Sequence, residues 1–73
     1  MDYQPIACMQ HERLEFAVLR RTPLHLKLED GRELTGLALD VFTQDGAEWL
    51  KFRVVSDVEE TLRLDRIAAF SEL

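Results

Sequence analysis

The stretch from Leu24 to Phe42 constrains the fold more than any other part of the chain. Leu24, Leu26 and Leu28 alternate with polar residues, which is the period of two expected of a half-buried β-strand. Asp30-Gly31 follows closely, and both residues tolerate the positive φ angles of a tight two-residue hairpin loop. The stretch therefore predicts a β-hairpin that turns at Asp30-Gly31.

The second strand of this hairpin changes face. Leu34 lies on one face of the expected strand, whereas Leu37, Leu39 and Val41 lie on the other, with Gly36 between them. A glycine inside a strand commonly marks a bulge or a tight bend. We therefore expect the strand to bulge or bend at Gly36, which would let a short sheet curl over its own core.

The remaining segments predict one helix and three further strands. Residues 9–21 have a helix-forming composition with no internal Gly or Pro, and they follow a short irregular segment at residues 1–8. Gln44-Asp45-Gly46 supplies a second turn signal beyond the hairpin. Alternating apolar residues after this turn predict strands at residues 48–55, 61–64 and 67–70.

The order of these elements predicts a mainly β, α+β fold. We expect an N-terminal helix followed by a small, strongly bent, Sm-like or SH3-like antiparallel β-barrel of about five strands at residues 24–70. An OB-type barrel is the nearest alternative, but it usually carries its helix later in the chain. A chain of 73 residues fits a single domain, residues 1–73. The expected core consists of the in-phase apolar residues Leu26, Leu28, Leu39, Leu50, Phe52, Leu62, Leu64 and Ile67.

The composition predicts a cytoplasmic protein and argues against a nucleic-acid partner. No segment approaches the ~20 apolar residues of a membrane span, and residues 1–10 lack the pattern of a signal peptide. The single cysteine, Cys8, cannot form an internal disulfide. Fourteen acidic residues against nine basic ones give a net charge of −5, which argues against a general nucleic-acid binder. This charge permits a basic protein partner, and the alternative is that it serves solubility alone.

The expected helix carries apolar residues in two groups. Leu14, Ala17 and Val18 follow i, i+3, i+4 spacing and therefore share one face. Phe16 and Leu19 fall elsewhere on the helix. Either the helix is covered on two sides, or part of it faces a partner.

The sequence contains no motif for catalysis, a metal or a cofactor. Cys8 and His11 have a spacing that suits two metal ligands, but neither His25 nor any further pair completes a site. There is no glycine-rich phosphate loop and no arrangement typical of a nucleophilic enzyme. We therefore expect no enzymatic activity, no metal and no cofactor.

Trp49, Lys51 and Arg53 share one face of the strand expected at residues 48–55. An aromatic side chain beside cations is how small barrels hold single-stranded RNA, through stacking and phosphate contacts. This face is therefore a candidate second contact surface. The opposing interpretation, which the acidic net charge favours, packs Trp49 beneath the N-terminal helix and pairs the two cations with nearby acids.

Three short motifs, at the start, the first turn and the end of the chain, carry a family resemblance. They are Tyr3-Gln4-Pro5-Ile6 with Cys8, Leu28-Glu29-Asp30-Gly31, and Leu62-Arg63-Leu64-Asp65-Arg66-Ile67 followed by Phe70-Ser71. With these motifs in register over essentially the whole chain, the sequence resembles the Rof family, the bacterial Rho-binding antiterminators. The resemblance implies an Sm-like barrel with an N-terminal helix. It also implies binding to the N-terminal RNA-binding domain of the termination factor Rho, which blocks RNA loading and inhibits Rho-dependent termination.

The resemblance further implies which residues contact Rho. The family's helix presents acidic residues to basic RNA-binding residues of Rho, and these acids match Glu12 and Glu15, next to His11, in this sequence. The chain departs from the family just after Cys8, where the well-known members are more acidic and this chain has Met9-Gln10 before His11. We expect a monomer that contacts Rho through Glu12, Glu15 and His11 and does not bind nucleic acid directly.

Overall fold

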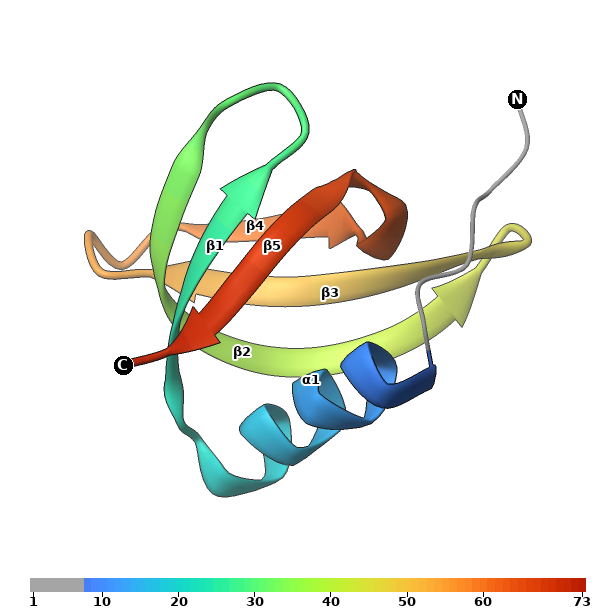
Figure 1. Ribbon diagram of the computed structural model, residues 1–73, viewed down its shortest axis with the longest axis horizontal. Helices are drawn as coiled ribbons and strands as arrows, with labels where there is room; N and C mark the ends of the chain where they lie inside the picture. The colour runs from blue at the N-terminus through green and yellow to red at the C-terminus, as the bar shows by residue number, and fades with distance from the viewer. Residues whose placement is uncertain (1–7) are drawn as a thin grey trace.

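The computed structural model describes the backbone of residues 8–73 and the side chains of residues 11–73. The expected irregular segment at residues 1–8 lies outside the described residues except for Cys8, which is the first helical residue. Five antiparallel strands follow the helix, so the expected fold class is confirmed. The elements in Figure 1 are α1 (Cys8–Arg20), β1 (Pro23–Leu28), β2 (Glu33–Gln44), β3 (Ala47–Val54), β4 (Glu59–Arg63), the 3-10 turn η1 (Leu64–Arg66) and β5 (Ile67–Glu72).

The sheet is curled because one long strand belongs to both of its halves. The strand order is β4-β3-β2-β1-β5, and β2 curves beneath the other strands in Figure 1. The first part of β2 pairs with β1, and the rest pairs with β3. Gly36 lies at the change of partner, opposite both Leu24 of β1 and Val54 of β3. The sheet therefore folds over its own core at β2.

The irregularity expected at Gly36 is found three residues later. The register between β2 and β3 shifts between Ala38 and Asp40, which makes Leu39 the extra residue of a bulge. Gly36 has a different role, because an added Cβ atom would lie 1.9 Å from the carbonyl oxygen of Arg53. A strand glycine marks either a bulge or a close backbone approach. Here it marks the close approach, and the bulge, one of the two alternatives expected at Gly36, lies at Leu39 instead.

The two-residue hairpin loop expected at Asp30-Gly31 is found at the second turn instead. The Leu28 N–H donates to the Arg32 carbonyl oxygen at 2.8 Å, and this bond encloses the three residues Glu29-Asp30-Gly31 instead of the expected two. Gly31 has the expected positive φ, +92°. The two-residue loop connects β2 to β3 instead, where φ is 54° at Asp45 and 75° at Gly46. Two successive positive φ angles are what a type I′ hairpin turn requires.

The core contains most of the residues predicted for it. Its buried residues are Leu14, Ala17, Leu24, Leu26, Leu28, Ala38, Leu50, Phe52 and Leu64. Leu62 and Ile67, predicted as buried, are only half-buried but pack against this cluster. Leu39, the extra residue of the bulge, is half-buried and lies outside the cluster, so its prediction as a core residue is wrong.

α1 packs against β2, and a Schellman arrangement ends it. The N–H of Thr22 donates to the carbonyl of Ala17 at 3.1 Å, and the N–H of Arg21 donates to that of Val18 at 3.4 Å. Arg21 has φ 53°, a conformation that helices most often give to glycine at this position. The helix therefore ends at Arg20, one residue before the predicted end. No helix within residues 8–73 is long and apolar enough to cross a membrane.

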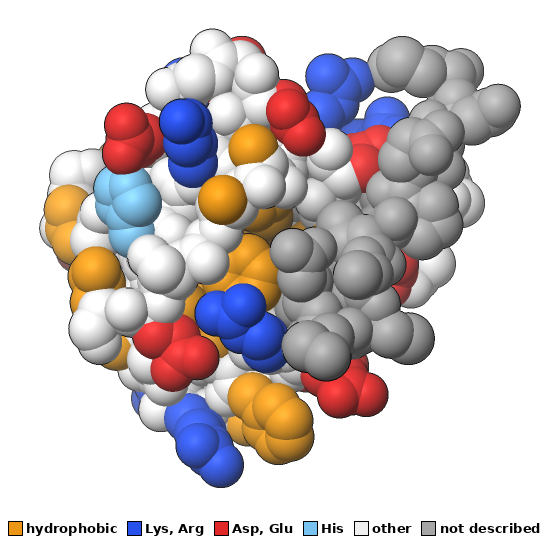
Figure 2. Space-filling model, viewed as in Figure 1, with side chains coloured by type: hydrophobic (Ala, Val, Ile, Leu, Met, Phe, Trp, Pro, Cys, Tyr) orange, Lys and Arg blue, Asp and Glu red, His pale blue; other side chains and the backbone are white. Residues whose placement is uncertain are grey.

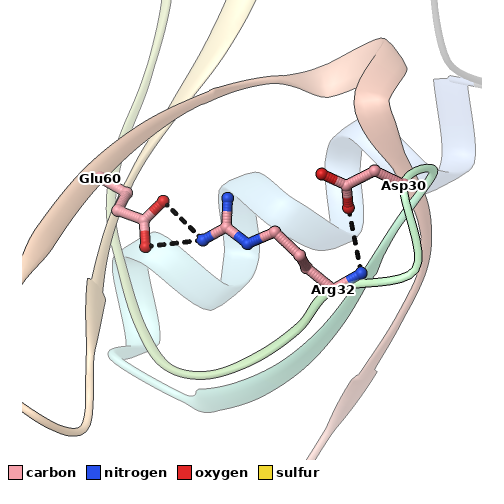
Figure 3. A network of polar contacts seen from close by, with 3 residues as sticks. All are labelled: Asp30, Arg32 and Glu60. Carbon is pink, nitrogen blue, oxygen red and sulfur yellow. Dashed lines mark hydrogen bonds and ion pairs between the residues drawn. The ribbon is translucent and has the colours of Figure 1, made fainter.

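An ion pair between Arg32 and Glu60 links the β1–β2 loop to the edge strand β4. Arg32 Nη2 donates to both carboxylate oxygens of Glu60, at 3.0 and 3.1 Å, and Figure 3 shows the two side chains reaching across the gap between their elements. The backbone N–H of Arg32 donates to Asp30 Oδ1 at 3.0 Å and so fixes the loop from which Arg32 extends. Because Arg32 is half exposed, this pair contributes about 0.2–1 kcal/mol to stability.

Candidate partner-binding surface

α1 has one face in the core and one face in solvent. Leu14 and Ala17 are buried, and Val18 packs against the core, as their spacing predicts. On the opposite face, Phe16 is 54% exposed and Leu19 is 78% exposed. The sequence left two arrangements open for this helix. Within residues 11–73, no element covers its second side, so the arrangement in which the helix is covered on two sides is ruled out.

The two predicted acidic contact residues lie on the solvent face of α1. Glu12 and Glu15 are both exposed. Glu15 Oε1 lies 3.1 Å from His11 Nδ1, one helical turn earlier. Among the side chains of residues 11–73, none forms an ion pair with Glu12. The carboxylate of Glu12 is thus available to a partner, and that of Glu15 is held at the surface by a neighbour on its own helix.

His11, the third predicted contact residue, joins α1 to β3. Its Nε2 atom lies 2.5 Å from Glu48 Oε2, a charged contact when the imidazole is protonated, although the geometry falls outside that of an aligned hydrogen bond. The side chains of His11 and Glu48 are 25% and 28% exposed. The imidazole therefore lies between Glu15 and Glu48, where it orients Glu15 and is itself largely covered.

Two hollows flank the exposed residues of α1. One, of about 370 Å³, is lined by Glu12, Glu15, Phe16 and Leu19. The other, of about 210 Å³, lies between α1 and β2 and is lined by Glu15, Val18, Leu19, Asp40 and Val41. Both combine carboxylates with apolar side chains. Sequence reasoning missed Asp40 and Val41, since only the packing of α1 against β2 brings them beside the helix.

The arginines of α1 stack on aromatic rings. The Arg20 guanidinium lies 5.5 Å from the ring centre of Phe16, and that of Arg13 lies 4.7 Å from the ring centre of Phe70 on β5. Figure 2 shows acidic, basic and hydrophobic side chains side by side over α1, at the lower edge of the molecule. We define the helix surface as Glu12, Glu15, Phe16 and Leu19.

The candidate second surface has its cations paired within the chain. Lys51 Nζ lies 3.5 Å from Glu59 Oε1, and Arg53 Nη2 lies 3.4 Å from Glu59 Oε2. One carboxylate on β4 thus faces both cations. Trp49 Nε1 donates to the carbonyl oxygen of Gln44 at 2.9 Å, which fixes the indole.

Trp49 lies beside elements other than α1. It lines a hollow of about 300 Å³ together with residues of the β1–β2 loop, β4 and η1, among them Arg32, Leu62 and Arg66. Among the α1 residues whose side chains the structure describes, 11–20, none lines this hollow. We define the strand surface as Trp49, Lys51 and Arg53.

No group of three or more His, Cys, Asp or Glu side chains within the described residues is arranged to hold a metal ion. In the sequence, Cys8 and His11 have a spacing that suits two metal ligands. The side chain of Cys8 lies outside the described side chains.

Comparison with known proteins places the chain in a family. A family model described as "Modulator of Rho-dependent transcription termination (ROF)" matches residues 5–73. The chain is also similar to "Protein rof" of Escherichia coli strain K12, with 38% identity over 69 residues. That alignment covers 94% of this chain and 81% of the relative.

Two solved structures share the fold. YaeO from Vibrio cholerae O395, solved bound to magnesium, matches with a TM-score of 0.72 at 22% identity, over 84% of this chain and 79% of YaeO. The pleiotropic translational regulator Hfq matches with a TM-score of 0.70 at 13% identity, over 86% of this chain and 97% of Hfq. At these identities the likeness concerns the fold alone, and it confirms the Sm-like architecture.

Proposed function

The chain belongs to the Rof family of modulators of Rho-dependent transcription termination, and from this premise we propose that it inhibits termination by binding the N-terminal RNA-binding domain of Rho. In this proposal Glu12 and Glu15 contact basic residues of Rho, and the bound protein blocks the loading of RNA. His11 contributes indirectly, because it lies 3.1 Å from Glu15 and holds that carboxylate on the solvent side of α1.

The observation that supports this proposal best is the helix surface. Its exposed carboxylates, Glu12 and Glu15, stand beside two exposed apolar side chains, Phe16 and Leu19. Protein interfaces commonly combine an apolar centre with a polar rim. Leu14 anchors the same helix in the core, so binding would cost little additional ordering of the backbone. The helix surface is thus already organised for a partner.

The proposed mechanism is competition with RNA phosphates. A surface that holds RNA needs basic residues to neutralise phosphate groups. Carboxylates on a fixed helix occupy the same basic residues, and a net charge of −5 accelerates the encounter with a basic surface. The protein then acts by occupancy, as a monomer in the cytoplasm, without catalysis or a cofactor.

Direct RNA binding through the strand surface has weaker support. Glu59 lies within 3.5 Å of the side-chain nitrogens of Lys51 and Arg53, so phosphate groups would have to compete with a carboxylate that is already in place. The acidic net charge adds a general repulsion. We therefore retain protein binding as the proposed function.

Transcription in vitro tests the proposal. We expect added protein to increase read-through of a Rho-dependent terminator and to leave read-through of an intrinsic terminator, the matched control, unchanged. Labelled RNA bound to the N-terminal domain of Rho should also be displaced, because both ligands need the same basic residues. Unchanged read-through at the Rho-dependent terminator, or a complex that contains protein and RNA together, would contradict the proposal.

A further inference from the structure

The hollow between α1 and β2 has the composition of a site for a long basic side chain. Its lining contains the two carboxylates of Glu15 and Asp40 and the apolar side chains of Val18, Leu19 and Val41. Within residues 11–73, no basic side chain lines it. We propose that this hollow receives one arginine or lysine side chain of the protein partner, an inference that rests on the proposed function and names a contact residue, Asp40, outside the helix.

The chemistry of the lining matches the two parts of such a side chain. Lysine and arginine bury a hydrocarbon stem along apolar surface and keep the charged end near water. Here Val18 and Leu19 would contact the stem, and the carboxylates of Glu15 and Asp40 would contact the charged end. Leu19 is 78% exposed, so its coverage by a stem would also remove apolar surface from water.

The bulge in β2 places Asp40 at this hollow. With the bulge, Asp40 lies opposite Lys51 and Val41 lies opposite Leu50, which is fully buried. Without the extra residue, Asp40 would lie opposite Leu50 and its carboxylate would face the core. A bulge that redirects a side chain is a recurrent feature of functional sites. In this chain it brings a carboxylate from β2 to the side of α1.

The charge of Asp40 is not compensated within the described part of the chain. Its cross-strand neighbour Lys51 is paired with Glu59 at 3.5 Å, and Asp40 forms no ion pair with any side chain of residues 11–73. Among the side chains of residues 11–73, Glu15 forms an ion pair with His11 alone, and His11 also faces Glu48. Two carboxylates lining one hollow repel each other, and an incoming cation relieves this repulsion.

The hollow continues into the helix surface. Glu15 and Leu19 line both this hollow and the larger one beside Phe16. A partner that engages Glu12 and Glu15 therefore passes directly beside Asp40. A second basic residue on the partner, next to those that meet the helix, would reach the hollow without any rearrangement of the barrel.

The test compares the affinity of the full-length protein and its variants for the N-terminal domain of Rho. We expect Asp40→Asn to weaken binding roughly tenfold to a hundredfold, the usual effect of losing a hydrogen bond to a charged group. Leu19→Ala should also weaken binding. Asp57→Asn, on the exposed β3–β4 loop, is the matched control and should bind like the wild type. Melting curves of all variants check that each is folded.

The double variant Leu19→Ala, Asp40→Asn tests whether one side chain is held by both residues. We expect it to lose less affinity than the product of the two single losses, because both residues contact the same partner side chain. The inference would be overturned if Asp40→Asn binds with wild-type affinity. It would also be overturned if the double variant loses affinity by the full product of the two single losses. Either result would leave the proposed function in place. Failure of the wild type to bind Rho would remove the proposed function and this inference together.

Discussion

The helix surface and the strand surface differ in what happens to their charges inside the chain. On α1, Glu12 has no ion-pair partner among residues 11–73, and Glu15 contacts a histidine of its own helix. On β3, Lys51 and Arg53 both lie close to Glu59. The sequence predicts both surfaces as candidates, the helix surface through the family resemblance and the strand surface against the acidic net charge. The comparison teaches that charges paired across strands, such as those of Lys51 and Arg53, are less available to a partner than exposed helix carboxylates.

The apolar residues of the two surfaces also differ in how far they are exposed. Phe16 and Leu19 are more than half exposed beside the carboxylates of the helix surface. Trp49 is half-buried, and its ring nitrogen already donates to the chain's own backbone. Within residues 11–73, the helix surface therefore offers the unpaired carboxylate of Glu12 beside exposed apolar side chains, whereas the cations of the strand surface are paired.

The largest expected effect comes from removing the core that both surfaces share. Phe52 is fully buried, and it points inward from β3 between the outward-facing Lys51 and Arg53. Phe52→Ala should destabilise the protein by about 3–5 kcal/mol, which abolishes folding of both surfaces in so small a domain. Val55→Ala, at a site that is 80% exposed, is the control and should melt like the wild type. A Phe52→Ala protein that melts within a few degrees of wild type would show that β3 faces the other way.

A smaller effect should separate the two surfaces. Glu59→Gln removes the shared partner of Lys51 and Arg53 and should change stability by less than about 1 kcal/mol, because all three side chains are roughly half exposed. We expect filter binding at low salt to detect single-stranded RNA on this variant and none on the wild type, while inhibition of Rho stays unchanged. Glu60→Gln, whose partner is Arg32, controls for the change in net charge. If Glu59→Gln retains no RNA, pairing with Glu59 is not what prevents the strand surface from binding RNA.

The strands and the helix could be predicted because their signals are local. Alternation at Leu24, Leu26 and Leu28 follows from the two-residue period of a strand, and all three are buried. The positions of Phe16 and Leu19 outside the apolar face of α1 left two arrangements open, and their exposure in the structure decides between them. Each of these two patterns is contained within one element.

The features that could not be predicted depend on contacts between distant elements. A glycine in a strand indicates either a bulge or a close approach, and only the proximity of Arg53 to Gly36 decides between them. The place of Asp40 beside α1 depends on the bulge and on helix packing together. The contact of His11 with Glu48 joins elements far apart in the sequence.

The most direct test of the account is the affinity for Rho of a protein with both helix acids reversed, Glu12→Lys and Glu15→Lys. Like charges facing each other across an interface cost several kcal/mol, so we expect binding to fall by at least a hundredfold, with a circular dichroism spectrum that matches wild type. The control, Glu29→Lys with Glu33→Lys at the β1–β2 hairpin, changes the net charge equally at the far side of the molecule from α1 in Figure 1 and should bind nearly as well as wild type. If the helix variant binds Rho with wild-type affinity, α1 is not the contact surface and the central claim is wrong.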